Sequence, residues 1–272
     1  MNRNSQEKPS RPLAASHQRS WLWGRHAVTE TLTAGLWPVA ELLVDEQVSA
    51  AIINHLESLT SRKNLQIQRV SSRRLTELCH AEDHQGLLAR MGEFPFRTHQ
   101  DLCLRLREKA TEPSRKPSLP PLFVVCDRIQ DSHNFGAILR CCDAINADGV
   151  VIGERSQVSV TPHVARASSG AVNHLNLYRV ANLANALRDM KTDGLKLLAA
   201  SEKSTQQLWQ VDAKGAVAVV IGSEAAGIAP ELLAECDVQL AIPMFGGVGS
   251  LNAAVAAGIV LYECRRQQLV AT

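Results

Sequence analysis

The chain has 272 residues, of which 45% are hydrophobic and 21% are charged, and its net charge is +2. These values fit a globular protein with a sizeable core, and they exclude a polycation that binds nucleic acid through bulk charge. No apolar run is long and uncharged enough to cross a membrane. The seven cysteines are odd in number and include no C-x-x-C pair, which favours buried thiols in a reducing compartment over disulfides or a metal site. We therefore expect a cytoplasmic protein without a metal ion.

The first 120 residues predict a tail, a small domain and a linker. Residues 1–19 carry four basic residues and one acid among polar residues, and such a segment is expected to be disordered. Residues 20–93 are predicted to form a small α/β domain, with helices over 27–36 and 49–59 and strands over 39–44, 65–70 and 87–91. Residues 94–120 hold one amphipathic stretch at 101–108 and a proline-rich remainder, which predicts a linker.

Residues 121–272 alternate apolar strands with helices. The predicted strands are continuously apolar, as strands covered on both faces of a sheet are. Their alternation with helices predicts an α/β domain built on a parallel sheet, in which ligands bind beyond the carboxyl ends of the strands. We expect strands over 122–127, 149–153, 195–201, 216–224 and 238–244, and helices over 134–145, 183–190, 229–236 and 250–269.

Three of these strands run into a loop of glycine and small polar residues that leads to a helix. The three segments cover residues 126–140, 219–231 and 240–258. Glycines let the backbone approach a ligand closely, and a helix start presents free amide groups. Neither G-x-G-x-x-G after the first strand nor a P-loop is present, which argues against a dinucleotide site or a P-loop nucleotide site. The residues alone therefore predict a ligand site of unspecified chemistry.

The three loops carry motifs that resemble those of a known family. N-x-G-A-I-x-R at Asn134–Arg140, I-G-S-E-x-x-G-I at Ile221–Ile228 and I-P-M…S-L-N at Ile242–Asn252 are similar, in order and spacing, to the signature motifs of the SpoU/TrmH RNA 2′-O-methyltransferases of the SPOUT superfamily. R-A-S-S-G-A at Arg166–Ala171 resembles the small-residue segment between the first two motifs. In the first domain, W-G-R-H-A-V at Trp23–Val28 and H-Q-G at His84–Gly86 resemble the branch that methylates guanosine in large-subunit ribosomal RNA.

This resemblance implies a fold, a cofactor and a partner. The expected catalytic domain, residues 121–272, has a parallel sheet with a deep trefoil knot and binds S-adenosyl-L-methionine in the knot. Residues 20–93 are expected to bind the RNA substrate, and the protein is expected to work as a homodimer. The expected reaction is methyl transfer to a ribose 2′-hydroxyl, with ribosomal RNA as substrate. Transfer RNA as substrate, a non-catalytic RNA-binding protein of the same fold, and an α/β enzyme that uses another nucleotide remain as alternatives.

The resemblance also assigns catalytic roles. Arg140 is expected at the 2′-hydroxyl or its neighbouring phosphate, and a planar guanidinium suits a phosphate better than it suits a general base. Asn134 is expected either to cap the first helix, to contact substrate, or to do both. Glu224 is expected to orient Arg140 or to accept the hydroxyl proton. Ser250 and Asn252 are expected to shape the pocket, and Ser250 is also a candidate helix cap.

Two further sets of residues complete the expected sites. The cofactor is expected to contact backbone groups and apolar side chains at Gly222, Ile242, Met244 and Leu251. The stretch 61–74 holds five basic residues and no acid, which is either a solvated surface or a phosphate-binding one. These candidate RNA-binding residues are Arg62, Lys63, Arg69, Arg73 and Arg74.

Overall fold

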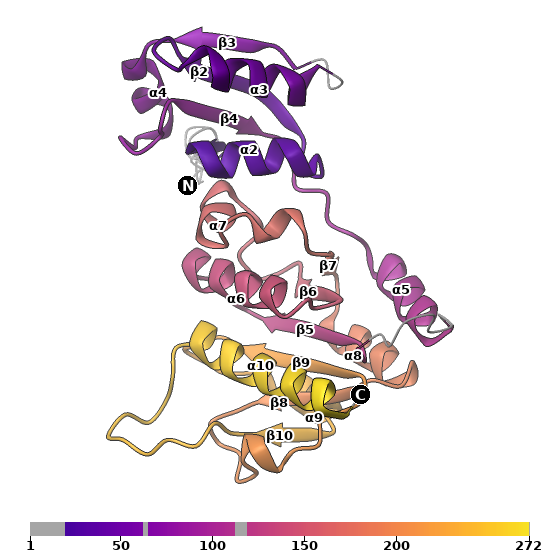
Figure 1. The fold of residues 1–272 in the computed structure, drawn as a ribbon. Helices are drawn as coiled ribbons and strands as arrows, with labels where there is room; N and C mark the ends of the chain where they lie inside the picture. The colour runs from indigo at the N-terminus through magenta and orange to yellow at the C-terminus, as the bar shows by residue number, and fades with distance from the viewer. Residues whose placement is uncertain (1–19, 62–64, 112–118, 272) are drawn as a thin grey trace, which may run out of the picture. The chain divides into compact units, whose positions relative to one another are not determined.

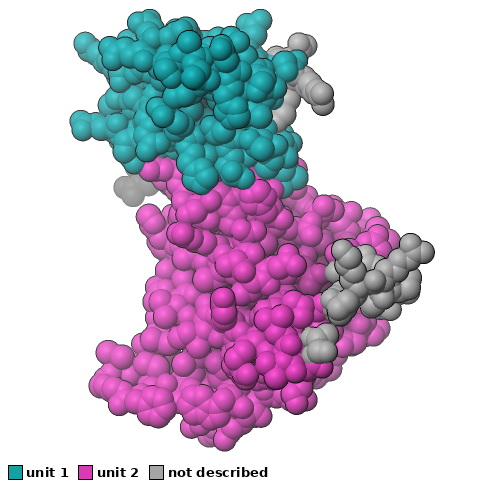
Figure 2. All heavy atoms as spheres, viewed as in Figure 1, with its two compact units in different colours: residues 1–93 teal, residues 94–272 magenta. Residues whose placement is uncertain are grey.

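The computed structural model describes residues 20–61, 65–111 and 119–271, and the chain divides into two compact units between Glu93 and Phe94 (Figures 1 and 2). The tail expected to be disordered, residues 1–19, lies outside the described residues, as do Arg62 and Lys63. No helix in the described part of the chain is both long and apolar enough to cross a membrane.

The described residues of unit 1 form a small mixed sheet with three helices (Figure 1). Its strand order is β1-β4-β2-β3, in which β2 and β3 are parallel and the other pairs are antiparallel. Trp21 and Trp23 pack with Leu43, Leu75 and Leu88 in its core. The elements are β1 (Trp21–Trp23), α2 (Arg25–Ala34), β2 (Val39–Asp45), α3 (Ala50–Thr60), β3 (Ile67–Val70), α4 (Ser72–Cys79) and β4 (Leu87–Met91). The sequence did not predict β1 and α4.

Unit 2 is built on a six-stranded sheet that is parallel throughout, as predicted. The strand order is β10-β8-β9-β5-β6-β7. The strands are β5 (Leu122–Asp127), β6 (Gly149–Gly153), β7 (Leu177–Val180), β8 (Lys196–Ala200), β9 (Val217–Gly222) and β10 (Val238–Leu240). The helices are α5 (His99–Thr111), α6 (Ser132–Ala144), α7 (Pro162–Ala167), α8 (Leu183–Thr192), α9 (Pro230–Glu235) and α10 (Ala253–Ala271), with 3-10 turns at Ala171–Asn173 and Leu208–Gln210.

Helices cover both faces of this sheet. On one face, α5, α8 and α9 pack in a single core cluster that includes Phe123, Val151 and Val220 of the strands. On the other face, α6 contacts both α7 and α10 (Figure 1). Two covered faces explain why the strands are apolar at every position.

Helix α5 lies where the sequence predicts a linker. Leu102 and Leu106 are buried in the core cluster of unit 2, and α5 contacts β7 and α8. The amphipathic stretch at 101–108 therefore belongs to the helix layer of unit 2. Among the described side chains of this helix, only two leucines are buried in the core, so its hydrophobic pattern alone gave a weak indication that it packs against the sheet domain.

The register of the parallel strands brings the polar loops together. Asp127 at the end of β5 pairs with Gly222 at the end of β9. On the other side of β9, Ala200 of β8 pairs with Ile221, and Leu240 of β10 pairs with Ala200. Four strands thus end side by side, and the loops that follow them share one edge of the sheet.

Candidate active site

A cavity of about 530 Å³ opens at this shared edge. Most of its lining comes from three segments, at Ala200–Lys203 where β8 ends, at Ile221–Ile228 where β9 ends, and at Gly249–Ala253 where α10 begins, and Ile242 and Met244 after β10 add to it. This volume and the mixed apolar and polar lining are those of a small-molecule site. Seven of the predicted site residues line it, namely Gly222, Glu224, Ile242, Met244, Ser250, Leu251 and Asn252.

The loop after β9 folds back tightly on its own strand. A Cβ atom on Gly222 would lie 2.2 Å from the backbone carbon of Gly227, which no side chain tolerates. The amide of Gly227 donates a hydrogen bond to the carbonyl of Ser223 at 2.9 Å, and Gly227 has a φ of 63°. Close backbone contact therefore requires glycine at position 222, and the left-handed φ favours glycine at position 227.

Asp127 and Arg128 hold this loop from the end of β5, and the sequence reasoning missed both. The carboxylate of Asp127, which is 3% exposed, accepts a hydrogen bond from the amide of Ala229 at 2.7 Å. It also pairs with the guanidinium of Arg128 through two contacts of 3.1 Å, and Arg128 donates to the carbonyl of Gly227 at 3.3 Å. An acid that closes an otherwise apolar strand was the available signal.

Asn134 joins the three motifs through its side-chain amide. Its Nδ2 donates to Oε1 of Glu224, and its Oδ1 accepts from Nδ2 of Asn252 at 2.9 Å. The three side chains therefore form one network, although Asn134 is 90 residues from Glu224 and 118 residues from Asn252. Among the described residues, Oε2 of Glu224 makes no hydrogen bond, which leaves it free to accept one.

The helix caps differ from those expected. Asp131, and not Asn134, caps α6, because its carboxylate accepts from the amide of Asn134 at 2.8 Å. Asn252, and not Ser250, caps α10, with its Oδ1 accepting from the amides of Ala254 at 2.9 Å and Val255 at 3.3 Å. Because Asn134 is not the cap of its helix, its side chain is available to bond with Glu224 and Asn252. Asn252 caps α10 with its Oδ1 and donates to Asn134 with its Nδ2.

Arg140 is exposed on α6 and does not line the cavity. Within the described part of the chain its guanidinium makes no hydrogen bond or ion pair. Glu224 contacts Asn134, so the expected role of Glu224 in orienting Arg140 is not seen. The five donors of this guanidinium are free for a phosphate.

The small-residue segment at Arg166–Ala171 has a packing role. A Cβ on Gly136 would lie 2.4 Å from the Cβ of Ala167, so α6 and α7 approach at a distance that only glycine allows. Ser168 is buried behind this contact. The glycine of the first motif and the small residues of this segment therefore fit each other.

In unit 1, three of the candidate RNA-binding arginines already contact other residues of the protein. Arg69 donates to the carbonyl of Glu46. Arg73 and Arg74 both pair with Glu77, at 3.1 and 3.5 Å, on the exposed surface of α4. Glu77, one helical turn beyond the end of the basic stretch 61–74, thus reduces the local positive charge of that stretch.

Comparison with known proteins places both units in one family. The SpoU rRNA methylase family profile matches residues 121–262, and the profile for RNA 2′-O ribose methyltransferase substrate binding matches residues 21–96. The YacO protein of Bacillus subtilis strain 168, assigned to the TrmH family of tRNA/rRNA methyltransferases, is 34% identical over 93% of this chain and 98% of its own length.

Solved structures agree in fold. An AdoMet-bound rRNA methyltransferase from Sinorhizobium meliloti superposes with a TM-score of 0.76 at 23% identity, over 92% of this chain and 88% of that one. An RNA 2′-O ribose methyltransferase superposes with a TM-score of 0.69 at 26% identity, over 94% and 91% of the two chains. The profile matches, the curated relative and the fold lead to one conclusion: this chain belongs to the SpoU rRNA methylase family of RNA methyltransferases.

Proposed function

We propose that this RNA methyltransferase transfers a methyl group from S-adenosyl-L-methionine to a ribose 2′-hydroxyl, and that its substrate is ribosomal RNA. The observation that carries the proposal is the network of Asn134, Glu224 and Asn252, which sets a free carboxylate oxygen beside a small-molecule cavity. Both parts of the site are needed for transfer between a bound cofactor and a nucleotide.

The cavity fits the cofactor. Gly222 leaves room for close approach because a Cβ there is excluded, and Ile242, Met244 and Leu251 offer apolar contact for an adenosine. Glu202 and Lys203 add charged groups of both signs to the lining, which suit the amino and carboxylate groups of a methionine. S-adenosyl-L-methionine supplies the activated methyl group when bound there.

The protein's own residues position the acceptor. Asn134 holds Oε1 of Glu224, so that Oε2 is directed to accept the proton of the 2′-hydroxyl. Arg140 holds a phosphate next to the target ribose through its planar fork. Fixing the nucleotide in this way lowers the barrier by removing its freedom of motion, which is a large contribution at a group-transfer site.

The dimer that the family resemblance implies is proposed here on the surface of α10. Val255, Ile259, Tyr262 and Leu269 are exposed and recur at helical spacing along one face of this helix. Trp209 stacks on Phe245 beside them, with ring centroids 6.4 Å apart, and Phe245 is 90% exposed. An exposed apolar stripe of this kind, interrupted by Arg266, suits a second copy of the chain.

The substrate is tested by mapping 2′-O-methylated nucleotides in RNA from cells with and without the gene. The proposal predicts that one or a few ribosomal positions lose the modification when the gene is deleted. Loss confined to transfer RNA would assign the enzyme to that alternative substrate. If every 2′-O-methyl nucleotide is retained while the protein still binds RNA, the non-catalytic alternative is supported.

A further inference from the structure

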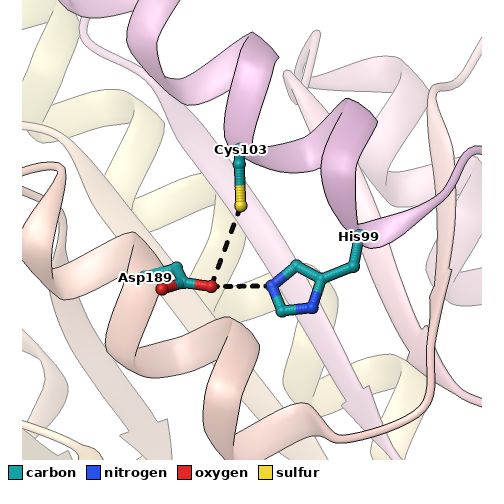
Figure 3. Close-up of side chains that lie close together, drawn as sticks. All are labelled: His99, Cys103 and Asp189. Atoms are coloured by element: carbon teal, nitrogen blue, oxygen red, sulfur yellow. Dashed lines mark hydrogen bonds and ion pairs between the residues drawn. The ribbon is translucent and has the colours of Figure 1, made fainter.

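A second cluster of reactive side chains lies in unit 2 on α5 and α8, outside the cavity described above. Nε2 of His99 lies 2.8 Å from Oδ2 of Asp189, and Sγ of Cys103 lies 3.7 Å from the same oxygen (Figure 3). One ligand atom from each residue lies within 4.8 Å of the other two. We propose that His99, Cys103 and Asp189 bind a zinc ion that fastens α5 to α8.

The geometry suits this ion. Bonds to zinc of about 2.0–2.3 Å place tetrahedral ligand atoms about 3.3–3.6 Å apart. The two separations from Oδ2 of Asp189 are 2.8 Å to His99 and 3.7 Å to Cys103, and the imidazole nitrogen and the sulfur lie within 4.8 Å of each other. Rotations of the His99 and Cys103 side chains that bring these two atoms closer together would complete the site. Imidazole, thiolate and carboxylate are together the ligand set of zinc, and three protein ligands leave a fourth position for water.

The two helices hold the ligands in place before any metal arrives. His99 and Cys103 are one turn apart on α5, so they share a face of that helix. The start of α5 is fixed by Asp101, which accepts hydrogen bonds from the amide and hydroxyl of Thr98 at 2.7 and 2.8 Å. Next to the ligands, Leu102 and Met190 are buried in the shared core, which fixes the backbones of both helices.

Solvent can reach the cluster. The side chains of His99 and Asp189 are 34% and 46% exposed, and the half-buried Cys103 lines an open groove together with them. Burial and the charge of Asp189 raise the pKa of the Cys103 thiol, so a proton occupies the sulfur in the absence of another cation. On binding, zinc displaces this proton to solvent and becomes the countercharge of both the thiolate and the carboxylate.

The test uses the full-length protein stripped of metal and titrated with Zn²⁺ by calorimetry, and with Co²⁺ by absorption spectroscopy. We expect one equivalent to bind, with a thiolate-to-cobalt charge-transfer band. Cys103→Ser should abolish that band, and His99→Gln and Asp189→Asn should each weaken binding at least about tenfold. Cys141→Ser, which removes another half-buried thiol outside the cluster, should change neither.

A second readout does not depend on variants. In peptide-resolved alkylation, Zn²⁺ should protect Cys103 and leave the labelling of Cys141 unchanged. Binding without a thiolate band, equal binding in Cys103→Ser, or no protection of Cys103 would overturn the proposal. The contact would then be a hydrogen bond between His99 and Asp189 that joins two helices, with a thiol beside it.

Discussion

Arg140 has an unpaired guanidinium on the surface of α6 among the described residues, and the proposed contact with a phosphate predicts how substitutions at this position change kcat. Lysine keeps the charge but loses the two-pronged geometry that grips a phosphate. We predict that Arg140→Lys and Arg140→Ala both lower kcat by about a hundredfold or more, because the ribose is no longer aligned. Affinity for S-adenosyl-L-methionine should change little, since Arg140 does not line the cavity.

Two measurements check this prediction, single-turnover methylation for the rate and calorimetry for cofactor affinity. A near wild-type rate for Arg140→Lys would exclude a phosphate fork. Glu224 would then be the leading residue for catalysis.

The Asn134 amide is the second test at this scale, because it is the only group in the described network that touches both other members. Asn134→Ala should release Glu224 and lower kcat at least about tenfold, as the removal of one hydrogen bond to a charged group costs about 1.5–3 kcal/mol. Thr161→Ala is the matched control, because Thr161 caps α7 by accepting a hydrogen bond from the amide of Val164, which belongs to none of the three motifs.

The control should cost about 1 kcal/mol of stability and leave the methylation rate unchanged. Thermal unfolding and single-turnover rates measured on both variants separate the two effects. If Asn134→Ala methylates RNA as fast as the control, the network is structural and does not position Glu224.

At the scale of elements, the sequence predicted the central strands of the sheet in unit 2 well. It missed the edge strand β7 and placed the start of α10 too early. Runs such as Leu122–Asp127 and Gly149–Gly153 are apolar throughout, so their strand state is fixed by burial on both faces. Strand β7 was missed because its four residues include the exposed Arg179. Helix α10 begins three residues later than expected, because the Asn252 side chain caps it.

The site was predicted as a set of residues but not as an arrangement. The resemblance of the motifs to a known family assigned Glu224, Ser250 and Asn252 to one site, and all three line the cavity. The contact of Asn134 with both other motifs depends on the register of β5 with β9, which no local pattern encodes. The support from Asp127 and the cavity residues Ser201–Lys203 likewise follow from which strands are neighbours. The expected knot stays a prediction.

Helix α5 gives a prediction about where the catalytic unit begins. Leu102 and Leu106 are buried against α8 and the strands, and removing two buried leucines costs roughly 3–6 kcal/mol. A fragment of residues 94–272 should therefore fold and bind S-adenosyl-L-methionine, whereas one of residues 121–272 should melt at a markedly lower temperature or aggregate. Circular dichroism melts of the two fragments check this, and equal melting temperatures would show that α5 contributes no stability.

Unit 1 gives the second prediction at this scale. If it binds RNA, deleting residues 1–93 should raise KM for RNA and leave cofactor affinity unchanged. Replacing Arg62, Lys63 and Arg69 with Glu should weaken RNA binding. The slope of log K against the logarithm of the salt concentration should also become shallower, by about 0.7–0.9 for each phosphate that is no longer neutralised. Filter binding at several salt concentrations measures that slope. An unchanged slope would show that these side chains are only solvated.

At the scale of the whole molecule, the apolar stripe on α10 predicts self-association. Ile259→Glu and Tyr262→Glu should each raise the dimer Kd by at least about a hundredfold, since burying an unpaired charge costs about 3 kcal/mol or more. Leu36→Glu, at another exposed apolar residue, is the matched control. Sedimentation velocity gives the oligomeric state, and a wild-type protein that is monomeric at micromolar concentration would rule out this dimer.

Methyl transfer to a ribose 2′-oxygen is the reaction on which the proposed roles of Asn134, Arg140 and Glu224 all depend, and it can be observed in vitro. Purified full-length protein is incubated with isotope-labelled S-adenosyl-L-methionine and ribosomal RNA from cells that lack the gene, and the labelled position is mapped at nucleotide resolution. We expect label on the 2′-oxygen of one or a few ribosomal nucleotides, and at least about tenfold slower labelling with Asn134→Ala under the same single-turnover conditions. Label on a base, or no transfer to any RNA by a protein that binds the cofactor, would contradict this mechanism.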